Sequence, residues 1–556
     1  MTIDAATGTL TRAADLTAAA TVARFLDTAA AATGRATFYN SADEQRTAEL
    51  AAHAGLAALD RALYTGLVGS PYMLDRARQT GALHLLSTPG GAPGEGEAIR
   101  RIVGQLSVPR MLNLYGMLAE QRVNNARARK LVLRTLLGAP AFGKWAVRYR
   151  RKLAAALRHA WGARTAGIVR AVLVRELAGE ELDAKELRIL ASEIDRHAPG
   201  RDRAVLHESV AFVLGAAGPF RQPLLRAYAE ARTDLDAGRT LPYETLEGLR
   251  GRFHSAEPHA RVLELTKSRL TAGQRLGMQA QAEKAGVEVE VDFARYDAVR
   301  LYVYAYERGM SDDVAQALAA RARTAAAALD LADRRIALVL DGSASMAGAR
   351  EQALRPVAAT LALRDVLREA AAETAEVWFG ARPDADGLVR PAGASGPAEA
   401  LIEALSGLPD LVVVVSDGYE NAPAGRFAEV LAAARDLGIT TPVVQFNPVA
   451  AAEASGVRAL SPDVPVAGVQ RVAGLEFAFC RMLLDADPAA ALRGLARLAG
   501  LPAGSVRNLL GPDREDVAAA ENAENAENRK SCENAENAEN AENSKNTASA
   551  EKEVAT

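Results

Sequence analysis

Apolar residues recur every three or four positions through most of the first 330 residues, a spacing that predicts amphipathic helices. Residues 47–67 and 312–332 show it clearly. Gly and Pro interrupt the pattern, for example at 88–91, as they do between the helices of a repeat array. We therefore expect residues 1–330 to form a HEAT-like α-helical array. Residues 287–291 are an exception, because VEVEV alternates with period two and predicts a strand.

The pattern changes from residue 334 onward. Short runs of consecutive apolar residues now alternate with helical segments; the runs are 336–340, 376–380, 411–416 and 442–446. Strands without a polar face are buried on both sides, which indicates a parallel sheet with helices on each face. We expect residues 334–515 to form a doubly wound α/β domain, so that the fold class is α plus α/β.

Residues 519–556 repeat the triplet Ala-Glu-Asn and contain almost no large apolar side chain. Such a segment buries too little surface to offset the loss of chain entropy on folding. We expect a disordered tail.

Composition narrows the class of protein. Hydrophobic residues make up 49% and charged residues 24% of the 556, which suits a chain with buried cores. The net charge is −3, so nucleic-acid binding would need a local basic patch. Two cysteines, Cys480 and Cys532, form no disulfide framework and favour a reducing compartment. With no signal-peptide pattern and no run of about 18 apolar residues, we expect a cytoplasmic protein without membrane contact.

Several catalytic motifs are missing from the sequence. It has no GxxxxGK[ST] phosphate-binding loop, no GxSxG nucleophile turn and no pair of histidines spaced for a zinc-binding helix. We therefore expect that the protein is not an enzyme.

A candidate metal site follows the apolar runs of the second part. Asp341, Ser343 and Ser345 come directly after the first run, and Asp417 follows the third. Ser395 lies in a Gly- and Ala-rich loop between them. The carboxyl ends of parallel strands meet at one edge of a sheet, and carboxylate and hydroxyl oxygens suit a divalent ion, in particular Mg²⁺. The alternative is a loop that keeps this shape and binds no ion.

This segment resembles the von Willebrand factor A domain, whose metal-ion-dependent adhesion site reads Asp-x-Ser-x-Ser, then a distant Thr and a distant Asp. Asp341, Ser343 and Ser345 match the first part and Asp417 the last. Ser395 stands where the family has Thr. The resemblance covers about residues 334–500. It implies that the two serines touch the metal, and that one coordination position is left for an acidic residue of a protein partner.

A basic stretch lies between Glu120 and Glu176, where there is no Asp or Glu and aromatic residues are interleaved with Arg and Lys. Basic side chains neutralise phosphates, and aromatic and guanidinium planes stack on unpaired bases. The alternative is a solvated helix face whose cations pair with acids elsewhere. We predict RNA contacts from Arg127, Arg129, Lys130, Lys144, Arg148, Arg150, Arg151, Lys152 and Arg158.

A helical array followed by an A-type domain resembles the Ro (TROVE) RNA-binding proteins. Arg24-Phe25-Leu26, the string at 34–39 (GRATFY) and the string at 144–161 (KWAVRYRRKLAAALRHAW) are similar to that family. The resemblance implies an RNA-binding scaffold for small non-coding RNA, structured or single-stranded, and no DNA partner is expected. The alternative is an adaptor that binds only protein through its Mg²⁺ site, for example an AAA+ ATPase.

Overall fold

Helices make up most of the molecule. The computed structural model describes residues 18–30, 41–89, 91, 94–329, 331–348, 353–421, 423–449, 457–472, 474–506 and 509. The expected tail at 519–556 and the string at 34–39 lie outside these residues. None of the described helices is long and apolar enough to cross a bilayer.

The first part of the chain runs from helix to helix, as the apolar spacing predicts. The elements are η1 (Leu26–Ala30), α2 (Ala42–Leu59), α3 (Arg61–Val68), α4 (Asp75–Ser87), α5 (Glu95–Gly104), α6 (Val108–Glu120), α7 (Ala126–Leu137), α8 (Phe142–Trp161), α9 (Ala163–Ala178), α10 (Ala184–Glu193), η2 (Asp195–His197), α11 (Arg203–Val213), α12 (Pro223–Glu230), η3 (Leu235–Thr240), α13 (Tyr243–Phe253), α14 (His259–Thr266), η4 (Lys267–Arg269), α15 (Ala272–Gly277), α16 (Gln279–Lys284), η5 (Phe293–Arg295), α17 (Ala298–Arg308) and α18 (Asp312–Ala326).

Polar side chains fix several of the helix starts. The periodic stretch at 47–67 divides at Asp60, whose carboxylate accepts hydrogen bonds from the N–H groups of Ala62 and Leu63 at 2.8 Å each. α2 therefore ends at Leu59 and α3 begins at Arg61. Such caps satisfy N–H groups that have no partner within the helix.

The second part is a five-stranded, all-parallel sheet in the order β2-β1-β3-β4-β5. Four strands lie at the predicted apolar runs, and the short β5 is additional. The elements are β1 (Arg335–Gly342), η6 (Ala344–Ala347), α19 (Arg355–Ala370), β2 (Glu373–Gly380), α20 (Pro397–Ser406), β3 (Leu411–Val415), α21 (Arg426–Asp436), β4 (Val443–Asn447), β5 (Val466–Gly468), α22 (Leu475–Ala486), α23 (Pro488–Leu498) and η8 (Ala503–Val506).

Successive residues of β1 point into two different cores, which explains its uninterrupted apolar sequence. Ile336, Leu338 and Leu340 pack with α17, α18, α19 and α22 on one face. Ala337 and Val339 pack with α20 and α21 on the other. The expected doubly wound sheet is thus confirmed, together with the helical first part. The HEAT-like repeat and the boundary near residue 330 stay predictions, and side chains from both sides of that boundary share one core.

The strand predicted at residues 287–291 is wrong. Val287 and Val289 are buried in a small core with Met278 and Ala282, but the segment has no strand neighbour. Its carbonyl groups accept hydrogen bonds from side chains instead. Gln279 donates to the carbonyl of Val289, and Arg275 donates to the carbonyl of Glu290. Alternating burial therefore reflects an extended segment lying on a helix, which produces the same sequence pattern as a strand.

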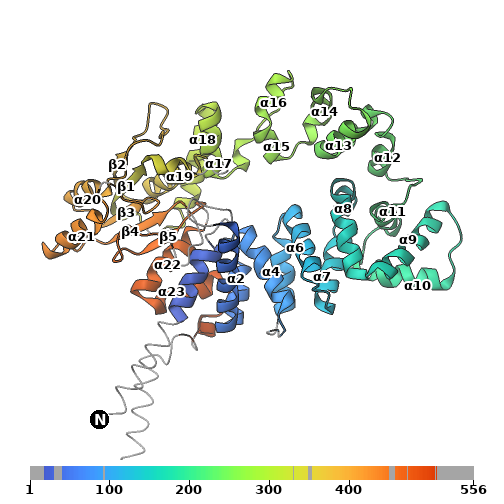
Figure 1. Ribbon diagram of the computed structural model, residues 1–556, viewed down its shortest axis with the longest axis horizontal. Helices are drawn as coiled ribbons and strands as arrows, with labels where there is room; N and C mark the ends of the chain where they lie inside the picture. Colours follow the sequence, from blue (N-terminus) through green and yellow to red (C-terminus); the bar gives the residue numbers. More distant parts are fainter. Residues whose placement is uncertain are drawn as a thin grey trace, which may run out of the picture.

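The described elements form a closed circuit (Figure 1). The helices lead from α2 to α9 and α10, then return through α12 to α16 and reach the sheet at α17 and α18. α22 and α23 follow the sheet and pack against the first helices, with Leu484, Leu492 and Leu495 in the same core as Leu63 and Leu67.

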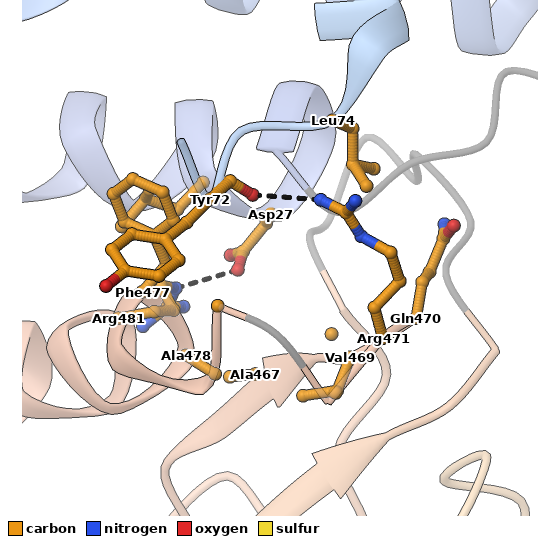
Figure 2. Close-up of a pocket in the computed structure, with 13 residues that line it drawn as sticks. Asp27, Tyr72, Leu74, Ala467, Val469, Gln470, Arg471, Phe477, Ala478 and Arg481 are labelled. Atoms are coloured by element: carbon orange, nitrogen blue, oxygen red, sulfur yellow. Dashed lines mark hydrogen bonds and ion pairs between the residues drawn. The ribbon is translucent and has the colours of Figure 1, made fainter. Parts of the chain in front are cut away.

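We call the contact between the first helices and α22 the closure, and define it by Asp27, Tyr72, Arg471, Phe477 and Arg481 (Figure 2). Arg481 pairs with Asp27 at 2.8 Å, and both side chains are largely buried. Arg471 donates to the carbonyl of Tyr72 at 3.1 Å, and the rings of Tyr72 and Phe477 meet edge to face, 6.0 Å apart. Beside these residues is a small cavity of about 50 Å³.

Candidate functional site

The structure brings the five predicted metal ligands together at the carboxyl end of the sheet. The Asp341 carboxylate accepts hydrogen bonds from the Ser343 N–H at 2.8 Å and from the Ser416 hydroxyl at 2.7 Å. The hydroxyls of Ser343 and Ser345 are 3.1 Å apart. Four of the five residues are buried and Ser345 is exposed, so the cluster has one side open to solvent.

Two loops complete the cluster. Asp417 accepts a hydrogen bond from the N–H of Tyr419 at 3.0 Å. Ser395, in the loop before α20, donates its hydroxyl to the carbonyl of Tyr419 at 2.5 Å. The Gly- and Ala-rich loop therefore lies beside the SDG turn, and the assignment of Ser395 as a metal ligand stays a prediction.

Burial gives the two carboxylates an unfavourable environment when both are charged. It raises the pKa of Asp341 to about 6, and the charge of Asp417 adds to this effect. The pKa of Asp417 is also raised by burial, although a hydrogen bond from Ser345 and the positive charge of Arg458 oppose the shift. Arg458 lies over the Tyr419 ring, with its guanidinium carbon 3.9 Å from the centroid.

Close backbone packing holds the first loop in place. A Cβ on Gly342 would lie 2.1 Å from the carbonyl oxygen of Ala381, so only glycine fits there. Gly380, at the end of β2, has φ of +73° and lies against the backbone of Ser343. Glycine tolerates that conformation without steric cost. The turn from β1 into η6, which carries Ser343 and Ser345, is thus held against the end of β2.

The donor set fits a hard divalent ion. Two buried carboxylates that repel one another, with hydroxyls beside them, are the oxygen ligands that Mg²⁺ takes while it keeps several waters. Among the described residues, no group of three or more His, Cys, Asp or Glu side chains is placed to hold a metal ion.

Asp341→Ala tests this assignment. We expect the affinity for Mn²⁺, used as a probe for Mg²⁺, to fall at least about 100-fold, since even changes in outer-shell partners cost 10–100-fold. Electron paramagnetic resonance of free Mn²⁺ measures it. Asp436→Ala, on the exposed end of α21, removes the same charge away from the cluster and should leave binding unchanged. Wild-type protein that binds no Mn²⁺ would establish the metal-free alternative.

The basic stretch forms most of α7 to α9, and α8 carries a kink in its middle. Tyr149 has φ of −123° and ψ of 24°, which are not helical values. The kink lies inside the basic string, beside Arg148 and Arg150. Arg150 is fixed there, since its Nε donates to the carbonyl of Phe212 at 2.9 Å and its guanidinium lies 4.3 Å from the Phe212 ring centroid.

A cavity of about 480 Å³ lies between α8 and α13, and we call it the α8–α13 cavity. Six cations and one carboxylate line it. Glu244 is the carboxylate, and it pairs with Arg148. The cations are Arg148, Arg150, Arg151, Lys152, Arg232 and Arg252, and the aromatic residues Tyr149, Tyr228 and Phe253 complete the wall.

The remaining predicted RNA-binding residues are distributed elsewhere. Arg127 pairs with the buried Glu95, which also binds Arg61, and this is a structural contact. Lys144 and Arg158 are exposed on α8 outside the cavity. Arg129 and Lys130 line a second cavity, described below. The structure therefore collects four of the nine predicted residues in the α8–α13 cavity.

Sequence reasoning missed the opposite wall of this cavity. Arg232 and Arg252 come from the return path of the circuit, and both guanidinium groups lie over the Phe253 ring, 5.2 and 5.1 Å from its centroid. The string at 250–254, RGRFH, combines basic and aromatic residues as the string around Tyr149 does. This similarity in sequence would have identified residues 250–254 as a second candidate for RNA binding.

Comparisons with known proteins give little further support. No protein-family model matches the chain, and no curated protein matches it. Among solved structures, it is similar to the crystal structure of the Ro (RSR) protein of Deinococcus radiodurans, with 17% identity over 87% of this chain and 99% of that chain and a TM-score of 0.38. A TM-score this low does not establish a shared fold, so the proposals below rest on the residues of this chain.

Proposed function

We propose that this protein is an RNA-binding scaffold that holds single-stranded RNA in the α8–α13 cavity. The observation that carries the proposal is the convergence of six cations and three aromatic side chains from two distant parts of the chain on one cavity. Cations bind the phosphates and aromatic rings stack on bases, a combination that suits unpaired nucleic acid better than a duplex. The resemblance of the basic string to Ro proteins is in accord with this function.

Charge balance supports the proposal. A solvated helix face would pair its cations with acids, and in this cavity Glu244 is the one carboxylate for six cations. Arg151, Lys152, Arg232 and Arg252 are exposed. Bringing so many like charges together is unfavourable without a bound polyanion, because like charges repel one another across the cavity.

The group of predicted metal ligands supports a second role in the same scaffold. Its buried acids and its exposed Ser345 suit a Mg²⁺ ion with one position free for a carboxylate of a protein partner. The competing proposal is that this is the whole function and that the protein is an adaptor without RNA. Chelation would then abolish every interaction, whereas binding of RNA depends on salt.

The first experiment is to purify the protein from its own host without nuclease, at moderate salt, and to sequence whatever RNA remains bound. We expect defined small RNAs that are released as salt is raised and are retained in a chelator. A preparation free of RNA, with a protein partner that chelator removes, would favour the adaptor.

A further inference from the structure

A second cavity of about 500 Å³ lies where three elements meet: one face of α7, the junction of α8 and α9, and the end of α10 with η2. α7 presents Ala126, Arg129, Lys130, Leu133 and Arg134, a spacing that puts all five on one side of the helix. The rest of the lining is Ala160, Trp161, Thr165, Glu193, Arg196 and His197.

The cations of this cavity have no ionic partner. Nearby cations are paired, Arg127 with Glu95 and Arg203 with Asp195. Arg129, Lys130, Arg134 and Arg196, in contrast, form no ion pair with any residue that the structure describes. Four positive charges thus face one carboxylate, that of Glu193.

Two N–H groups of lining residues lie beneath the wall, closed off from solvent, and lack an acceptor. Trp161 and His197 are 9% and 8% exposed, and neither the Trp161 Nε1 nor the His197 Nδ1 has a hydrogen-bond partner among the described residues. The Nε of Arg196 donates to the His197 Nε2 at 3.0 Å, which leaves the proton of the neutral ring on Nδ1. Burial and the charges of Arg196, Arg134 and Lys130 lower the pKa of His197 to about 4, so the ring is neutral at pH 7.

The start of α9 lies at the edge of the cavity. No side chain caps this 16-residue helix, and its first turn contains no acidic residue. The first N–H groups of a helix have no partner within it and carry partial positive charge, which makes an uncapped start a common place for anions. Thr165, in that first turn, lines the cavity and offers a hydroxyl.

We propose that this cavity binds a phosphate monoester. Four unpaired cations and the hydroxyl of Thr165, beside an uncapped helix start, favour a compact anion with several acceptor oxygens, and a phosphate group provides up to four. The volume exceeds what a bare ion fills and lies in the range of small-molecule sites, so a nucleotide or the phosphorylated end of a nucleic acid also fits. The site is separate from the α8–α13 cavity and does not depend on RNA binding there.

Isothermal titration calorimetry at pH 7, in a buffer without phosphate or sulfate, tests the proposal with inorganic phosphate, adenosine monophosphate and adenosine. We expect the first two to bind and adenosine not to bind. The variant Lys130→Gln/Arg134→Gln should bind phosphate at least about tenfold more weakly, since it removes two charge-assisted contacts. Arg170→Gln/Arg188→Gln is the matched control, because both side chains are exposed, on α9 and α10, and neither lines the cavity.

Two oligoribonucleotides of one sequence, with a 5′-phosphate or a 5′-hydroxyl, identify the source of the phosphate. Competition by the phosphorylated oligonucleotide alone assigns the site to nucleic-acid ends, and competition by neither assigns it to small phosphates. Absence of binding by phosphate and adenosine monophosphate, or equal binding by the wild type and Lys130→Gln/Arg134→Gln, overturns the proposal, even if the hydroxyl oligonucleotide still binds in the α8–α13 cavity.

Discussion

Replacement of Arg151, Lys152 and Arg252 by Gln is expected to lower the affinity for single-stranded RNA at least about 100-fold near physiological salt, because each lost charge-assisted phosphate contact costs about tenfold or more. These three side chains are exposed and line the α8–α13 cavity. Arg148 and Arg150 are less suitable for this test because their replacement would also break contacts within the protein. Arg148 pairs with Glu244, and Arg150 is held against Phe212.

The salt dependence of the same triple variant gives an independent result. Each lost phosphate contact on a single strand should reduce the magnitude of the slope of log K against log salt by about 0.7, so three contacts reduce it by about 2. Fluorescence anisotropy of a labelled oligoribonucleotide measures both quantities. A control with the same charge change, Arg382→Gln/Arg426→Gln/Arg493→Gln, alters exposed cations in the second part of the chain and should change neither. Equal affinities and slopes for the two variants would remove the cavity from the RNA-binding site.

Arg481→Met is expected to open the closure. It leaves the Asp27 carboxylate buried without its positive partner, a change that typically costs about 3–5 kcal/mol. Amide hydrogen exchange measures this as a fall in the local opening free energy of η1 and α22 at pH 8. Arg493→Met, on the exposed side of α23, should stay within about 0.5 kcal/mol of the wild type. The double variant Asp27→Leu/Arg481→Met removes both charges and should recover most of the loss.

The effect of Arg481→Met depends on pH. Burial raises the pKa of Asp27 to about 6 despite the attraction of Arg481. A folded-state pKa above the ordinary value of 3.8 means that the Asp27 carboxyl contributes stability to the closure below about pH 4, and that this contribution is lost as the pH rises through 6. Without Arg481 the carboxyl group holds its proton to still higher pH. The deficit of the variant should therefore be smaller at pH 5 than at pH 8, and an equal deficit at both would show that Asp27 is not its cause.

The sequence predicted structure best where the residues of one segment are enough to show whether that segment is buried. The runs around Leu338 and Val413 have no polar face, so a strand covered on both sides is the arrangement that buries them. Asp341 lies near the end of β1, Ser343 and Asp417 come directly after β1 and β3, and parallel strands bring their carboxyl ends to the same edge. The position of the predicted metal ligands follows from the apolar strands and from the shared edge at which these strands end. Whether the residues hold an ion stays a prediction.

The parts that were missed depend on contacts between distant segments. Val287 and Val289 show the alternation of a strand because they lie on a helix, and no local pattern distinguishes the two cases. Arg252 reaches the cavity from the return path of the circuit, about a hundred residues after Arg151. The pairing of Asp27 with Arg481 spans nearly the whole chain, and neither residue stands out from other charged residues in the sequence.

The two paths of the circuit differ in the size of their cores. One large core joins the helices from α2 to α11 with α22 and α23, whereas residues 227–289 are held by two small clusters. Arg151 and Lys152 belong to the first path and Arg252 to the second (Figure 1). Small cores open more readily, so amides of α13 to α16 should exchange faster than those of α6 to α8. We therefore expect the α8–α13 cavity to have one rigid wall and one more mobile wall, so that movement of the second wall changes its width.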